Sequence, residues 1–257
     1  MGDPVHVVLD NLSVRKSPAF ATGGPHNDGI PPERRYRSAT VAGVGRPRSP
    51  RGRARETHER LKREYPDADC ALTHDSPYQL IVATILSAQC TDERVNMVTP
   101  ALFERFPAPE DLAACDPREL EELIHSTGFY AAKTRNLIAM ADRLVRVHGG
   151  EVPTTMRELT ALGGVGRKTA NVVRSVAFDL PGLPVDTHVG RLSRRLGLTA
   201  QTDPVAVEKE LNPMIPAAER GDFSMRLILH GRQVCGARRA DCGSCVCNDY
   251  CPSAFAV

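Results

Sequence analysis

Four cysteines near the end of the chain constrain its fold more than any other feature. They follow the spacing C-x6-C-x2-C-x5-C, at Cys235, Cys242, Cys245 and Cys251. Thiolates this close together suit either one tetrahedral zinc ion or an iron–sulfur cluster, and the spacing alone does not choose between them. In both cases this part of the chain must fold as a compact loop around a metal centre. Cys247 lies in the same loop, and we expect it to be a free thiol.

The composition predicts a globular protein with an aliphatic core. The chain has 257 residues, of which 41% are hydrophobic but only 5% aromatic, and it has no tryptophan. The net charge of +2 does not by itself indicate a nucleic-acid partner. The other cysteines are scattered and no apolar signal segment opens the chain, so we expect a reducing, cytoplasmic location. The longest uncharged run, 76–91, is shorter than the ~20 residues of a membrane span.

The chain separates into an irregular start and a helical remainder. Glycine, proline, serine and arginine dominate residues 1–52, which we expect to form a disordered basic extension, either inert or weakly attracted to DNA. Beyond it, apolar residues recur at helical spacing between short joints of glycine and proline, and no long run alternates with period two. The sequence therefore predicts an all-α fold. The expected helices are 56–65, 77–88, one capped by Asp92, 117–126, 131–147, 155–162, 168–178, 186–196, 205–215 and 224–235.

Residues 159–170 are typical of a helix, a tight turn and a second helix. Gly164 and Gly166 permit a turn that directs backbone N–H groups outward where the second helix begins. The N-terminus of a helix binds phosphate without reading bases. A P-loop is excluded, because Arg167 separates the last glycine from Lys168. An ordinary glycine-rich joint between helices remains the alternative.

Lys168 and Asp186 are the candidate catalytic residues. Lys168 lies in the first turn of the second helix, where the positive end of the helix dipole disfavours an ammonium group. A neutral amine is what nucleophilic attack requires, although most lysines are simply solvated charges. Asp186 opens a predicted helix, so it is either a cap or a carboxylate that stabilises positive charge.

Three motifs in the same order carry a resemblance to a known family. They are LSAQCTD at 86–92, GVGRKTANVV at 164–173 and VDTH at 185–188, followed by the four cysteines. Over about residues 55–253 the chain resembles the endonuclease III family of DNA glycosylase/AP lyases. The resemblance implies two helical domains flanking a DNA cleft, with a helix-hairpin-helix. The implied domains are a six-helix domain at 70–180 and a [4Fe–4S] cluster domain made of 53–69 and 181–257.

The resemblance also implies roles for single residues. Lys168 would attack C1′ of the damaged nucleotide, and Asp186 would stabilise the developing charge or assist proton transfer. Gln89 and Phe129 would fill the gap left by a flipped nucleotide, although Phe129 could equally be a core residue. The residues expected to bind the DNA backbone are Gly164, Gly166, Arg167, Arg238 and Arg239. The expected cluster ligands are Cys235, Cys242, Cys245 and Cys251.

The implied function is base excision repair of double-stranded DNA by a monomer. The enzyme would remove oxidised pyrimidines through a lysine Schiff base and cleave 3′ to the abasic site by β-elimination. A pyrimidine-dimer glycosylase of the same family is one alternative. A non-catalytic DNA-binding protein with a cluster or zinc is another, and the pairing of Lys168 with Asp186 argues against it.

Overall fold

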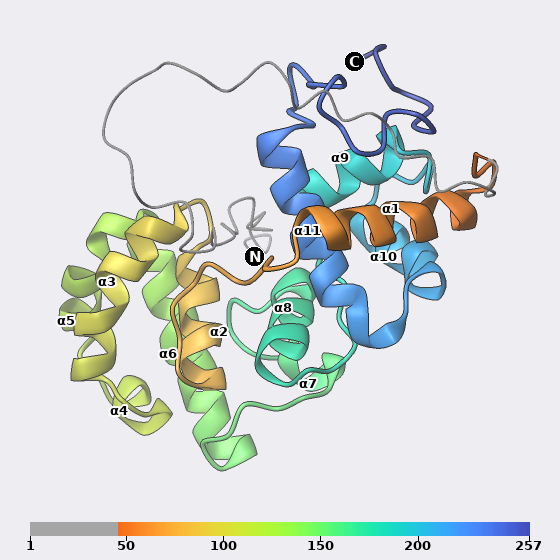
Figure 1. Cartoon of the computed structure of the whole chain (residues 1–257). Coiled ribbons are helices and arrows are strands. Elements are labelled where there is room, and N and C mark those ends of the chain that lie inside the picture. The colour runs from red at the N-terminus through yellow and green to blue at the C-terminus, as the bar shows by residue number, and fades with distance from the viewer. Residues whose placement is uncertain (1–45) are drawn as a thin grey trace, which may run out of the picture. The chain divides into compact units, whose positions relative to one another are not determined.

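The computed structural model describes residues 46–257, and across them the regular structure is helical (Figure 1). An isolated antiparallel bridge joins Cys235 to Ala240. The prediction of an all-α fold is therefore confirmed. Within the described range, no helix combines the length and apolar character needed to cross a membrane.

These residues form two compact units, one of which is discontinuous in sequence. The first unit is Cys70–Asp186, and the second combines residues 46–69 with Thr187–Val257. Residues 1–45 of the predicted disordered extension lie outside the described residues. The end of that extension was predicted wrongly, because residues 50–52 already belong to the helix α1 (Pro50–Glu64).

The first unit is built around α2. Every residue from Leu80 to Leu86 is buried, because α2 packs against α3, α6 and α8. A helix that is apolar on all sides belongs in the centre of a bundle. The helical elements of the first unit are α2 (Pro77–Leu86), α3 (Asp92–Arg105), α4 (Pro109–Ala113), α5 (Pro117–Ile124), η2 (His125–Thr127), α6 (Tyr130–His148), α7 (Met156–Leu159) and α8 (Arg167–Ala177).

In the second unit, the upstream helix α1 supports the C-terminal loop. Thr57 Oγ1 and Tyr250 Oη lie 2.8 Å apart, and Arg60 Nη1 donates to Asp249 Oδ1 at 2.6 Å. The helix α11 packs against both α1 and α9. The remaining helical elements are α9 (Thr187–Arg195), α10 (Pro204–Leu211), η3 (Asn212–Met214), η4 (Ala217–Glu219) and α11 (Arg220–Gln233).

Several helix starts use the same local device, a polar cap followed by proline. The cap side chain accepts a hydrogen bond from the first turn, and proline fits the first helical position because it has no N–H to satisfy. This device begins α1, α2, α5 and α10, with the pairs Ser49–Pro50, Ser76–Pro77, Asp116–Pro117 and Asp203–Pro204.

One predicted cap was wrong by a single residue. Thr91, not Asp92, caps α3, because its hydroxyl accepts a hydrogen bond from the N–H of Arg94 at 3.2 Å. Asp92 is the first helical residue and is buried.

Candidate functional site

The hairpin consists of α7, a turn and α8. Gly164 has a φ of +72°, which favours glycine, and an added Cβ would lie 2.9 Å from the Cβ of Asn136 in α6. Gly166 precedes α8 without capping it through a side chain, and nothing lies within 4 Å of a Cβ built there. The turn is therefore closed against α6 on one side, while the start of α8 has room for an anion to approach.

Lys168 is the second residue of α8 and is half-buried, as is Arg167. The same helix buries Ala170, Val172 and Val173 and packs against α2. The backbone that carries Lys168 is therefore part of the core of the first unit. A rigid backbone is what a nucleophile needs in order to be held in one orientation.

The segment that leads to Asp186 lies against α8. Gly182 is so close that an added Cβ would come within 2.4 Å of the carbonyl oxygen of Asn171. The N–H of Leu180 donates to the carbonyl of Arg174 at 2.9 Å. Asp186 ends the first unit, directly before α9, and its side chain is 6% exposed. The first unit therefore contains both candidate catalytic residues, and α8 supports the backbone of each.

Gln89 and Phe129 share an unusual backbone conformation. Both have a positive φ, +51° for Gln89 and +48° for Phe129. Residues other than glycine adopt this region at a cost of roughly 1–3 kcal/mol, and they concentrate at functional sites. Gln89 is exposed between α2 and α3, and the Phe129 side chain is 66% exposed before α6. Phe129 is therefore not a core residue.

Sequence reasoning missed Lys133, a buried lysine in α6. Its side chain is 4% exposed, and Nζ donates to the carbonyls of Leu86 and Thr127 at 2.8 Å each. Burial lowers the pKa of Lys133 to about 8. A sequence signal existed, because Lys133 shares the buried stripe of α6 with Leu137, Met140 and Leu144 at helical spacing.

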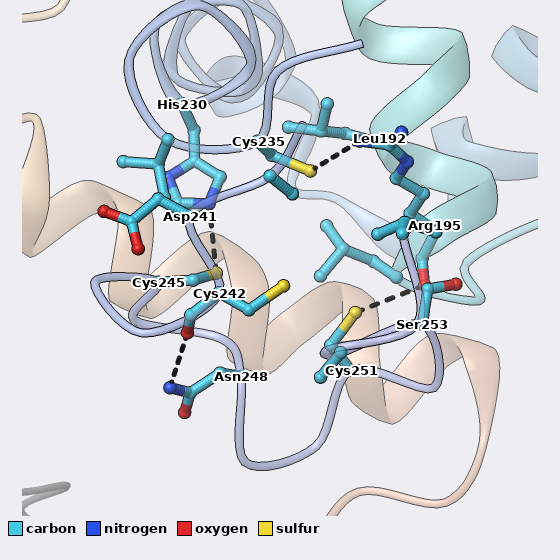
Figure 2. Close-up of a pocket in the computed structure, with 15 residues that line it drawn as sticks. Leu192, Arg195, His230, Cys235, Asp241, Cys242, Cys245, Asn248, Cys251 and Ser253 are labelled. Carbon is cyan, nitrogen blue, oxygen red and sulfur yellow. Dashed lines mark hydrogen bonds between the residues drawn. The ribbon is translucent and has the colours of Figure 1, made fainter. Parts of the chain in front are cut away.

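The four predicted cysteine ligands line one pocket in the second unit. Cys235, Cys242, Cys245 and Cys251 surround it, and Leu192, Arg195 and His230 form part of its wall (Figure 2). Cys247 does not line the pocket and is completely buried. In the described range, no three histidine, cysteine, aspartate or glutamate side chains converge as ligands of a single metal ion. Four thiols around one pocket suit either a zinc ion or an iron–sulfur cluster.

Several N–H groups point at the pocket's sulfur atoms. Arg195 Nη1 donates to Cys235 Sγ at 3.3 Å, and the N–H of Phe255 donates to Cys242 Sγ at 3.3 Å. His230 Nε2 lies 3.2 Å from Cys245 Sγ. A hydrogen bond with Cys247, together with His230, lowers the pKa of Cys245 to about 5. These contacts favour the thiolate form of Cys245, whereas burial raises the pKa of Cys251.

Two half-buried arginines, Arg191 and Arg195, bind backbone carbonyls of the C-terminal loop. Arg195 donates to the carbonyls of Gly236 and Ala237, and Arg191 donates to the carbonyl of Cys235. These two side chains therefore have a structural role in holding the loop. Arg238 and Arg239 are exposed on the same loop.

Comparisons with known proteins agree with a helix-hairpin-helix fold for this chain. Residues 82–217 match the model of the HhH-GPD superfamily of base excision DNA repair proteins. The chain is 54% identical to endonuclease III of Synechocystis sp. over 209 residues, which are 81% of this chain and 95% of the relative. It is 38% identical to endonuclease III of Escherichia coli K12, over 75% of this chain and 91% of the relative.

A solved non-covalent endonuclease III–DNA complex has a chain of the same fold. It superimposes with a TM-score of 0.75 at 42% identity, covering 79% of this chain and 96% of the other. A trapped covalent endonuclease III–DNA intermediate also gives a TM-score of 0.75, at 43% identity. The helical fold, the hairpin and this degree of identity together show that the chain belongs to the endonuclease III family of DNA glycosylase/AP lyases.

Proposed function

We propose that this protein removes oxidised pyrimidines from duplex DNA and then cleaves the strand 3′ to the abasic site. The observation that carries the proposal is Lys168 at the second position of α8, in the hairpin. One amine can support both steps, because it can displace the base and then remain bonded to C1′ as an imine. Because its substrate is the chromosome, the protein would work in the cytoplasm, at the nucleoid.

In the proposed first step, Lys168 Nζ attacks C1′ and the N-glycosidic bond breaks. The base leaves with the bonding electrons and takes up a proton. The attached nitrogen loses a proton, and its restored lone pair then opens the sugar ring, so that O4′ gains a proton and a C1′ iminium forms. Positive charge builds up around C1′ as the base leaves, and the carboxylate of Asp186 would stabilise it.

The second step is β-elimination. Loss of a C2′ proton supplies the electrons for a C2′–C3′ double bond, and the C3′–O bond breaks so that the phosphate leaves. Water then hydrolyses the imine and frees Lys168. The iminium makes the C2′ proton more acidic, which is why the Schiff base matters for strand cleavage.

The proposed DNA contacts divide into backbone binding and gap filling. The open start of α8, at Gly166 and Arg167, suits a phosphate group, and the exposed Gly164 lies in the turn just before it. Stacking of an exposed aromatic side chain on a base stabilises binding by roughly 1–3 kcal/mol, so Phe129 suits one side of the gap left by a flipped nucleotide. The amide of Gln89 suits the orphaned base on the other side. Arg238 and Arg239 on the C-terminal loop would add phosphate contacts that weaken with salt.

We further propose that Cys235, Cys242, Cys245 and Cys251 hold a [4Fe–4S] cluster. All four thiols line one pocket, which supports a shared metal centre. The choice of a cluster over zinc rests on the likeness to the endonuclease III family. When bound, the cluster would cross-link the C-terminal loop and so hold Arg238 and Arg239 in place.

Cys247→Ser and Cys251→Ser should have opposite effects on the cluster. Cys247 is buried and does not itself line the pocket, although it hydrogen-bonds to Cys245, so its serine variant should keep the brown colour and the bound iron of the wild type. Cys251 lines the pocket, so its serine variant should lose most of the iron or fail to fold. Visible absorbance and iron analysis of anaerobically purified protein check this. A colourless wild type with one equivalent of zinc would refute the cluster, and the reverse serine result would refute the ligands.

A panel of lesions in matched duplexes tests the proposed function. We expect the wild type to release thymine glycol and dihydrouracil, to nick the strand, and to be trapped on the DNA by borohydride. Undamaged duplex and an adenine mispair serve as controls and should remain intact. Preferential release from cyclobutane pyrimidine dimers would make the protein a dimer glycosylase, and binding without release or trapping would contradict the proposal.

A further inference from the structure

Lys133 connects the two turns that carry Gln89 and Phe129. Its Nζ donates to the carbonyl of Leu86, three residues before Gln89, and to that of Thr127, two residues before Phe129. Its own N–H donates to the carbonyl of Phe129 at 3.0 Å. One residue therefore bonds to the end of α2, the end of η2 and the start of α6.

A buried lysine needs hydrogen-bond partners inside the protein, because burial removes the hydration of its amine. Here the amine meets carbonyl groups at two helix ends, where the backbone has acceptors without partners in the helix and the dipole is negative. Removing the amine would leave both carbonyls without this donor while they remain buried. The buried amine of Lys133 therefore keeps both hydrogen bonds only while the ends of α2 and η2 stay together.

The two turns also contain backbone that needs support. Gln89 and Phe129 both have a positive φ, and such residues keep that conformation only where their surroundings hold it. Their exposed side chains have few contacts of their own to fix them. The hydrogen bonds of Lys133 reach a carbonyl beside each turn, so this one residue supports both.

We propose that Lys133 is a positioning residue, which holds Gln89 and Phe129 at the spacing needed to fill the gap in a damaged duplex. The inference rests on the proposed function, because it assumes that these two side chains enter the duplex. Lys133 need not touch DNA in this proposal, yet it should affect activity against double-stranded substrate. A single-stranded abasic site has no partner strand and no gap to fill, so Lys133 should not matter there.

The test is a mutant cycle measured as single-turnover kcat/KM on a thymine glycol duplex. Lys133→Met keeps the length of the side chain but removes the donor. In the wild-type background it should lower kcat/KM on the order of ten- to a hundredfold, the scale of a misplacement of about 1 Å. In a Gln89→Ala/Phe129→Ala background it should lower kcat/KM less than about threefold further, because residues that act through one another are not additive.

Leu144→Ala is the matched control for lost stability. Leu144 lies on the same buried stripe of α6, eleven residues further along, and is fully buried. We expect it to lower the melting temperature at least as much as Lys133→Met while leaving kcat/KM on the duplex unchanged. Both variants should cleave a single-stranded abasic oligonucleotide at the wild-type rate. If Lys133→Met does not fold, Lys133→Gln, which keeps one donor group, takes its place in the same cycle.

The possible failures are distinguishable. A wild type that releases no thymine glycol and is not trapped overturns the proposed function itself. A Gln89→Ala/Phe129→Ala variant as active as the wild type overturns the gap-filling role. An equal loss from Lys133→Met in both backgrounds, on the single strand as well as the duplex, overturns the positioning role alone.

Discussion

Lys168→Gln should abolish the covalent trapping of this protein on abasic-site DNA by borohydride. Borohydride traps the protein only when an amine of the protein has formed an imine with C1′. Glutamine preserves most of the length and polarity of the side chain but has no nucleophilic amine. Base release and strand cleavage should fall below detection together, because both steps use the same nitrogen. Denaturing gels of borohydride-treated mixtures measure the trapped fraction directly.

Two controls make this result specific to Lys168. Lys209→Gln removes an exposed lysine in the last turn of α10 and should be trapped like the wild type. Binding of Lys168→Gln to an uncleavable abasic analogue should stay within about tenfold of the wild type, since the loss of one positive charge beside DNA changes affinity modestly. Undiminished trapping of Lys168→Gln would assign the nucleophile to another amine.

Asp186→Asn should slow base release by about two orders of magnitude, the scale of one lost electrostatic stabiliser. The substitution keeps the shape of this buried side chain and removes its charge. Positive charge at C1′ is greatest while the base is leaving, so release of thymine glycol should suffer more than cleavage of a preformed abasic site. Single-turnover rates on the two substrates give the comparison.

Asp203→Asn is the matched control, because Asp203 also precedes a helix and its side chain caps α10. Asparagine caps helices as well as aspartate does, so this variant should keep its stability and activity. If Asp186→Asn releases thymine glycol at the rate of the wild type, Asp186 is a structural residue. If it slows both substrates equally, its role is not confined to the departure of the base.

Most helices could be predicted from the sequence, because their signals are local. Caps such as Ser76, followed directly by proline, and apolar stripes such as that of α6 determine where a helix begins and which face it buries. The errors were also local. The start of α1 was missed because its first turn lies in a stretch rich in arginine and proline, and α4 was missed because it is only five residues long. A helix this short carries too few periodic residues to be recognised unless a neighbouring motif marks it, as the glycine-rich turn marks α7.

The candidate residues themselves were found from the sequence, because their chemistry depends on residue type and spacing. Lys168 lies one residue after the start of α8, and the four cysteines are close enough in sequence to meet in one loop. Both facts follow from short-range geometry. Whether Phe129 is exposed did not follow, since glycine before an aromatic residue occurs in surface turns and in cores alike.

The sequence alone determined the helical class, the family and the residue types of the site, because caps, stripes and motifs are properties of neighbouring positions. Only the tertiary structure decided what distant residues do. It directed the half-buried Arg191 and Arg195 to the carbonyls of the C-terminal loop, and it buried Lys133 between the ends of α2 and η2. The physical reason is that a charged side chain is buried only where distant backbone supplies its hydrogen-bond partners, and no local pattern records which carbonyls those will be.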